Sequence, residues 1–132
     1  MNKKILSEVS PGELLDKISI LEIKILHVVD ENKKKKIKTE YNILEKIKNS
    51  SIEFTDEIKN LYLSLKDVNI VLWGIEDKIR VCEKNKDFGK VFIELARNVY
   101  FNNDDRARIK LEINNILKSE IVEIKQYTNY KK

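Results

Sequence analysis

The stretch from Thr55 to Lys86 constrains the fold most, because it contains no proline and its apolar residues recur three and four positions apart. That spacing lines them up along one side of an α-helix, so we predict a single long helix over residues 56–85. The stripe consists of Ile58, Leu61, Leu65, Val68, Leu72, Ile75 and Ile79. Such a stripe indicates a side that packs against other elements.

The composition extends this interpretation to the whole chain. The 132 residues include one proline and three glycines, are 42% hydrophobic and 36% charged, and contain no run in which apolar and polar residues alternate. A helical bundle fits this composition better than a sheet protein does. We therefore predict one all-α domain over residues 1–132, a bundle of about five helices with a central polar and ionic cluster. The predicted helices span residues 11–29, 35–49, 56–85, 88–101 and 104–127.

The first helix has the clearest start signal. Ser10 can cap the helix, Pro11 suits its first position, and Glu13 stands where a capping box requires an acid. The helix that follows is apolar around much of its circumference, so we expect it to lie inside the bundle or between two subunits. Glu22 is the one charge that interrupts its main apolar arc.

Charged residues also interrupt the long stripe. Glu76, Arg80 and Glu83 project from the same side of the helix as its apolar residues. Arg106 and Lys110 share a side with Ile113 in the same way. If the chain reverses at 85–87 and again at 102–104, Arg106 would lie near the level of Glu76, and Lys110 near Arg80 and Glu83. We therefore predict a candidate ligand-binding cluster of Glu22, Glu76, Arg80, Glu83, Arg106 and Lys110.

Two interpretations of this cluster remain open. Buried charges are costly unless they are paired, so the cluster can be an ion-pair network that fixes the register of the bundle. It can equally be a pocket in which the three bases hold a phosphate or carboxylate, while Glu76 or Glu83 binds hydroxyls, a metal ion or a proton. The three bases favour a pocket, and the three acids that could neutralise them favour a network.

The net charge of the chain excludes few classes of function. The 26 basic residues face 22 acidic ones, for a net charge of +4, which is typical of a soluble surface and not of a nucleic-acid footprint. Lys33 to Lys36 form the only basic run that could contact an anion or a nucleic acid. No aromatic residues interleave with these lysines, so a solvated helix start is the favoured interpretation and nucleic-acid binding is disfavoured.

Cys82 and His27 are the single cysteine and the single histidine. They allow no internal disulfide and no zinc site of thiolates and imidazoles, so we predict no metal site and no cofactor. The N-terminus lacks an apolar stretch of secretory length, and no segment is apolar enough to span a bilayer. We predict a cytoplasmic protein.

Known helical enzymes match the chain poorly. Helical nucleotide pyrophosphohydrolases hold magnesium with acids spaced three apart on two helices. Glu13 and Asp16 have that spacing, but the capping box explains Glu13 better, and Glu76 and Glu83 are seven apart. Helical chorismate mutases carry a first-helix arginine pattern that is missing here. Catalytic residues therefore stay unassigned, and whether the protein is an enzyme stays open.

Three segments resemble a family of small uncharacterised bacterial helical proteins. They are GELLDKISILEIK at 12–24, Asn69 with LW at 72–73 and IEDKIR at 75–80, and NDDRARIK at 103–110. The likeness extends from about Val9 to Tyr127. It implies a helical bundle in the setting of cell-surface polysaccharide pathways, and it carries over no activity. The matching segments contain Glu22, Glu76, Arg80, Arg106 and Lys110.

The functional prediction follows from the cluster and this resemblance. We expect a small binding or accessory protein whose Glu, Arg and Lys cluster holds a small anionic ligand or fixes a surface that faces a partner. The first alternative is a small helical enzyme that acts on a phosphorylated or nucleotide-sugar substrate. The second is nucleic-acid binding through the Lys33–Lys36 run. A further apolar line on the long helix, Leu63, Ile70 and Val81, predicts a homodimer.

Overall fold

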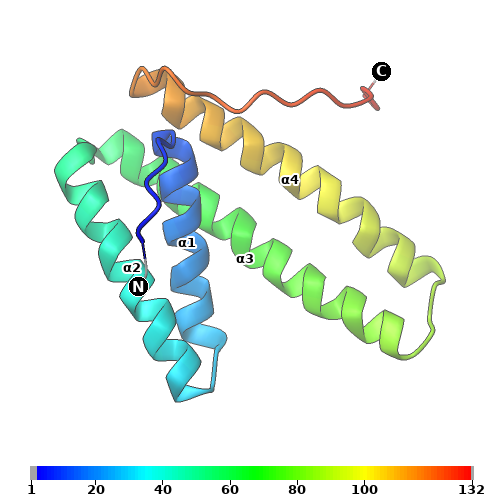
Figure 1. Ribbon diagram of the computed structural model, residues 1–132. Helices are drawn as coiled ribbons and strands as arrows, with labels where there is room; N and C mark the ends of the chain where they lie inside the picture. The colour runs from blue at the N-terminus through cyan, green and yellow to red at the C-terminus, as the bar shows by residue number, and fades with distance from the viewer. Residues whose placement is uncertain (1–2, 132) are drawn as a thin grey trace.

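The computed structural model of the protein describes residues 3–131 and has only helices as regular secondary structure in that range (Figure 1). The four helices are α1 (Pro11–His27), α2 (Glu31–Ser51), α3 (Asp56–Lys84) and α4 (Lys90–Ile116). The all-α class is therefore confirmed. The predicted number of about five helices is wrong, because a single helix stands where we expected two.

Helix α4 runs straight through the polar triplet at 102–104 that we expected to end it. Asn102 is accommodated within the helix, where its side-chain amide donates to the carbonyl of Asn98 at 2.8 Å. The helix ends later, at a left-handed Lys118 with a φ of 54°, and the amide of Ser119 closes the turn on the carbonyl of Asn114 at 2.9 Å. From this turn to residue 131, the last that the structure describes, there is no helix, so the predicted end at residue 127 is wrong.

The C-terminal segment that follows, residues 119–131, runs as an extended tail back along α4 (Figure 1). Ile121 and Ile124, which helical spacing predicted to point inward, are exposed in this tail. We refer to residues 119–131 as the tail.

Helix α1 is the central element of the fold and packs against each of the other three helices. Its predicted start is confirmed, since the Ser10 hydroxyl accepts from the amide of Glu13 at 3.1 Å and Pro11 takes the first helical position. The core around it combines residues of α1, α3 and α4. Its buried members are Leu14, Leu15, Ile18, Ile58, Tyr62, Leu65, Ile109 and Ile113.

Helix α2 covers the outer side of α1 and buries none of its own residues fully. It begins four residues earlier than predicted because Asp30 caps it, accepting from the amide of Lys33 at 3.0 Å. The run Lys33–Lys36 therefore lies in the first turns of the helix and is largely exposed.

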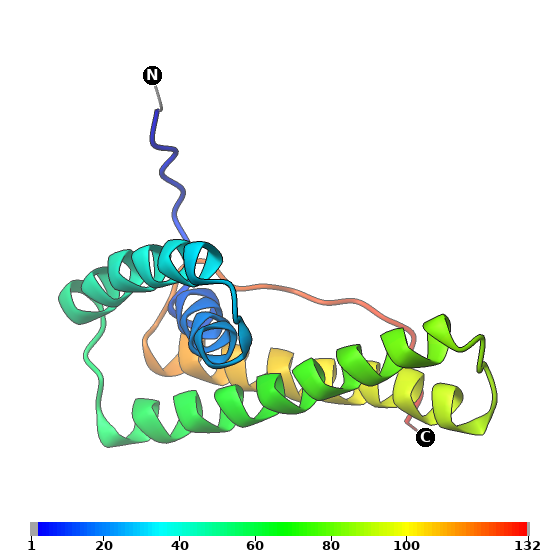
Figure 2. The same ribbon diagram turned by 90° about the horizontal axis from the view of Figure 1, so that it is seen from below.

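Helices α3 and α4 pack against each other and extend together well past α1 and α2 (Figure 2). We call this two-helix extension, residues 70–108, the arm. Its only buried residues are Ile75 and Cys82, both from α3. Phe88 and Val91, which we expected to be buried, are exposed because no third helix covers the arm. No helix within residues 3–131 is long and apolar enough to cross a membrane.

Candidate functional site

The site is organised around the carboxylate of Asp16, which has only 2% of its side chain exposed. Helix α1 holds this acid on the side that faces α3 and α4. The side-chain amide of Asn69, on α3, donates to Asp16 Oδ1 at 2.9 Å and to the hydroxyl of Ser19 at 2.8 Å. A buried carboxylate must be hydrogen-bonded and paired with a cation to keep its charge, and α4 supplies the cation.

Arg106 provides that charge through two parallel hydrogen bonds. Its Nε and Nη2 atoms donate to the two oxygens of Asp16 at 2.9 and 2.5 Å. This fork is the geometry in which guanidinium binds carboxylate best. The hydrogen bonds to Asp16 raise the pKa of Arg106 although burial acts against them. Nη1 of the same guanidinium donates to Asn103 Oδ1 at 3.3 Å.

Lys110 lies one turn further along α4, with its ammonium 3.8 Å from the Asp16 carboxylate. Only 10% of its side chain is exposed. It donates to Glu13 on α1 at 2.7 Å and to Glu123 in the tail at 3.0 Å. Burial alone would lower the pKa of Lys110, but the hydrogen bonds to these two carboxylates outweigh it and the pKa rises.

The tail contributes one acid and one base to the site. Glu123 accepts from Lys110 and lies 2.9 Å from the ammonium of Lys125. The hydrogen bonds from Lys125 and Lys110 lower the pKa of Glu123 to about 2. Its carboxylate therefore remains ionised over the whole physiological pH range.

These groups line an open cavity of about 370 Å³ between α1, α4 and the tail, which we call the ionic pocket. Its lining is polar apart from Ala107, and it consists of Glu13, Asn103, Arg106, Ala107, Lys110, Glu123 and Lys125. Three cations from two elements thus converge on one cavity. Over the described range 3–131, no three His, Cys, Asp or Glu side chains gather in a way that could hold a metal ion.

Gly12 explains how α1 comes so close to α4 that Asp16 meets Arg106. Its amide donates to the side-chain oxygen of the buried Asn114 at 2.7 Å. A Cβ atom at this position would lie 2.6 Å from the carbonyl oxygen of Lys110. Only glycine permits such a contact without a shift of one helix.

Glu22, a predicted member of the cluster, lies in a different contact set. Its carboxylate accepts from the hydroxyl of Tyr62 and, at 2.6 Å, from the ammonium of Lys66. Burial is the main cause that raises the pKa of Tyr62, and the hydrogen bond to Glu22 raises it further. These contacts join α1 to α3 away from the ionic pocket.

The charged row on α3 is not internal, which corrects the expected juxtaposition. Glu76 and Arg80 are exposed on the arm and pair with each other at 2.9 Å, and Glu83 is also exposed. The last α1 side chains that meet this side of α3 are near Trp73, where His27 packs against its ring at 5.1 Å, so Arg80 and Glu83 lie beyond α1. Because α4 does not reverse at 102–104, Lys110 lies beside Glu13 and Asp16 of α1 and not near Arg80 and Glu83.

One part of the predicted juxtaposition does hold. Arg106 and Glu76 both line a second, smaller cavity of about 280 Å³, together with Asn69, Trp73 and Asn103. Of the six predicted residues, Arg106 and Lys110 therefore lie in the ionic pocket and Glu76 borders a neighbouring cavity. Glu22, Arg80 and Glu83 lie elsewhere.

Asp16, Ser19 and Glu123 also belong to the site, although helical spacing did not predict them. Gly12, Asp16 and Ser19 are spaced four and three apart, so they share one side of α1. A small residue and two polar ones on one side of an otherwise apolar helix could have indicated a close polar contact. Glu123 had no such signal, because the tail looked like a continuation of a helix.

Comparisons with known proteins identify the family of the chain and give no function. The model of a family of unknown function, DUF6165, matches residues 5–131, so the chain belongs to this family. No curated protein matches the chain. No solved structure matches it either.

Proposed function

We propose that this member of the family is a binding or accessory protein that holds the anionic group of a small ligand in the ionic pocket. One observation carries the proposal: Arg106, Lys110 and Lys125 converge on a cavity that is open to solvent. A convergence of cations on a cavity with few apolar atoms is the arrangement that phosphate and carboxylate groups require.

The contacts of the pocket indicate how an anion would bind. Asp16 orients Arg106 through Nε and Nη2, which leaves N–H groups on the outer side of the guanidinium for a ligand. Lys110 and Lys125 currently share the carboxylate of Glu123. A phosphate or carboxylate of the ligand would replace Glu123 there. Because the pocket and Asp16 together hold three bases and three acids, this exchange leaves one positive charge for the ligand.

The setting of cell-surface polysaccharide pathways, which the family resemblance implies, suggests which anions to test first. Sugar phosphates and nucleotide sugars are the phosphorylated compounds of such pathways, and a cytoplasmic location would give the protein access to them. The enzyme alternative depended on Glu76 or Glu83, which lie exposed on the arm outside the ionic pocket. No observation favours nucleic-acid binding at Lys33–Lys36 either, so we propose neither.

Calorimetric titration of the full chain with inorganic phosphate and with a panel of sugar phosphates tests the proposal. Lys125→Ala removes one cation from the pocket and leaves the core intact, so we expect it to weaken binding several-fold. Lys118→Ala is the matched control, because it removes the same charge from a residue near the tail that lies outside the pocket. Equal losses in the two variants, or no binding of any of these anions, would overturn the proposal.

We also propose that two copies of the chain associate through a side of α3 that begins at Leu63 and continues into the arm. The predicted dimer residues Leu63, Ile70 and Val81 are each about half exposed, at 46%, 45% and 56%. They recur seven and eleven positions apart, so they lie on one side of α3. A two-helix arm cannot cover both of its apolar sides by itself, and a second arm would complete a four-helix arrangement.

A further inference from the structure

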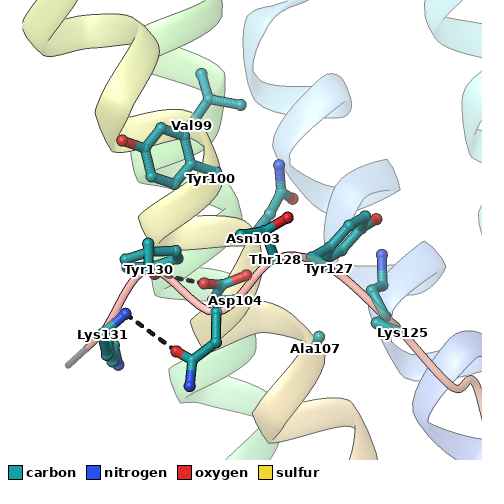
Figure 3. A pocket seen from close by; sticks show the side chains of 11 residues that line it. Val99, Tyr100, Asn103, Asp104, Ala107, Lys125, Tyr127, Thr128, Tyr130 and Lys131 are labelled. Atoms are coloured by element: carbon teal, nitrogen blue, oxygen red, sulfur yellow. Dashed lines mark hydrogen bonds between the residues drawn. The ribbon is translucent and has the colours of Figure 1, made fainter.

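A second and larger cavity adjoins the ionic pocket. It has a volume of about 790 Å³ and lies between α4 and the tail (Figure 3). Asn103, Ala107 and Lys125 line both cavities, so the two are direct neighbours. A ligand whose anionic group lies in the ionic pocket would therefore extend its remaining atoms into the larger cavity.

Aromatic side chains line the larger cavity on both of its sides. Tyr100 comes from α4, and Tyr127 and Tyr130 come from the tail (Figure 3). The ring of Tyr130 packs edge-on against Tyr100, with centroids 5.4 Å apart and an interplanar angle of 74°. Rings in this arrangement leave no slot between parallel faces, which a flat nucleobase would prefer. Tyr127 is 73% exposed and has Lys125 near its ring at 5.8 Å, and an exposed tyrosine ring suits the apolar C–H side of a sugar.

The polar groups of the cavity fit the same occupant. Asn103, Asp104, Thr128 and Asn129 all line it, and together they offer amide, carboxylate and hydroxyl groups. The carboxylate of Asp104 already accepts a hydrogen bond from the hydroxyl of Tyr130 at 2.5 Å. Asp104 is thus positioned to accept from hydroxyl groups in the cavity, and a sugar presents several of them on one ring.

From this arrangement we infer that the ligand is a phosphorylated monosaccharide. Its phosphate lies in the ionic pocket against Arg106, Lys110 and Lys125, and its sugar ring lies in the larger cavity between Tyr100 and the tail. Asn103 stands at the junction of the two cavities, with its side-chain oxygen bound to Arg106. This inference rests on the proposed function, because it names the class of ligand that the ionic pocket would take.

The test compares four probes by calorimetric titration of the full chain: inorganic phosphate, glucose 1-phosphate, free glucose and adenosine monophosphate. We expect glucose 1-phosphate to bind at least tenfold more tightly than inorganic phosphate, and the nucleotide to bind no more tightly than inorganic phosphate. Asp104→Ala and Tyr127→Ala should remove this tenfold gain and leave the affinity for inorganic phosphate unchanged. Asp105→Ala is the matched control, because Asp105 is exposed beside Arg108 and outside both cavities.

The outcomes separate the two proposals. If inorganic phosphate binds and glucose 1-phosphate binds no more tightly, the inference about the sugar fails and the anion site stands. Tighter binding of the nucleotide would assign the larger cavity to a base and overturn the inference. Failure of both phosphate compounds to bind would overturn the inference and the proposed function together. Equal losses of glucose 1-phosphate affinity in the Asp104 and Asp105 variants would also contradict the assigned role of the cavity.

Discussion

The contact between Asp16 and Arg106 is a bidentate ion pair whose carboxylate is buried. A buried pair contributes little net stability compared with apolar residues of similar size, because both charges lose their hydration. The removal of one partner is different, because it leaves the other charge buried and unpaired. The pair therefore does more to fix the position of Arg106 than to stabilise the fold, and it should still be costly to break.

We predict that Arg106→Ala lowers the free energy of unfolding by about 3–5 kcal/mol, because the buried Asp16 carboxylate loses both hydrogen bonds from the guanidinium and keeps only the more distant Lys110 as a cation. Urea denaturation followed by circular dichroism measures this change. Arg108→Ala provides the control, since Arg108 is exposed on the same helix and its loss should change stability by no more than about 0.5 kcal/mol. Similar effects of the two substitutions would show that Arg106 is not held as described.

Glu123 gives the contact between the tail and α4 a defined pH dependence. Lys125 and Lys110 lower its pKa from 4.5 to about 2, so its protonation weakens the contact. The contribution of Glu123 is fully present above pH 4.5 and is lost as the pH falls towards 2. We therefore predict that the Glu123 carboxyl carbon titrates well below the other exposed glutamates in NMR spectra of protein labelled at glutamate.

The Glu123→Gln variant assigns the signal, because the corresponding resonance disappears. The same variant carries no carboxylate to compete with a ligand, so it should bind inorganic phosphate more tightly than the wild type does. A titration midpoint near 4.5 for Glu123 would show that the tail does not contact Lys110 in solution.

At the scale of elements, the approach of α1 to α4 depends on Gly12. We predict that Gly12→Ala lowers the free energy of unfolding by about 1–3 kcal/mol, the usual cost of overpacking, because the new methyl group would meet the backbone of Lys110 at 2.6 Å. Thermal and urea unfolding measure the loss. The displaced helix should also carry Asp16 away from Arg106 and weaken anion binding.

Gly74 differs from Gly12, because no neighbouring helix lies close to it. It lies inside α3, and a Cβ atom at this position would meet nothing within 4 Å beyond the backbone of its own helix, so this glycine permits no close approach of a neighbour. Gly74→Ala should therefore stabilise the protein by about 0.5–1 kcal/mol through helix propensity alone. A stabilising effect of Gly12→Ala, or a large loss from Gly74→Ala, would contradict the packing of these helices.

The elements that the sequence predicted well are those whose ends carry local signals. Ser10 and Pro11 place the start of α1, and the apolar stripe places α3 within one residue at each end. The polar triplet at 102–104 misled the prediction, because asparagine and aspartate favour helix ends but can also remain inside a helix that tertiary contacts hold. In α4, Arg106, Ile109 and Lys110 directly after the triplet contact α1 and the core, which keeps the helix continuous.

The candidate site could be predicted only in part, for a related reason. Helical spacing selected Arg106 and Lys110, which both line the ionic pocket, because they share a side of α4 with buried Ile113. Helical spacing within α3 contains no information on where α1 ends relative to α3. The exposed residues Glu76, Arg80 and Glu83 were therefore predicted to be internal. The partners of Arg106 and Lys110 come from α1 and the tail, at sequence separations that periodicity within one helix cannot detect.

At the scale of the whole molecule, the arm is the feature that the fold of one chain leaves incomplete. Near α1 three helices share a core, whereas in the outer part of the arm α3 and α4 pack against each other and no third helix covers them (Figure 2). The exposed apolar residues of the arm include Ile70, Val71, Val81, Phe88, Val91 and Ile93. Exposed apolar residues gathered in this way commonly mark a protein–protein interface.

We predict that the chain forms a homodimer through the arm and that Ile70→Lys prevents it, because the substitution places a charge in the centre of the line formed by Leu63, Ile70 and Val81. Sedimentation equilibrium should give twice the chain mass for the wild type and a single chain mass for the variant. Ile43→Lys is the matched control, since Ile43 is 55% exposed on α2, far from the arm, and should leave the dimer intact. A wild-type chain that stays monomeric at high concentration would refute the arm as a self-association surface. Loss of the dimer in both variants would place the interface elsewhere.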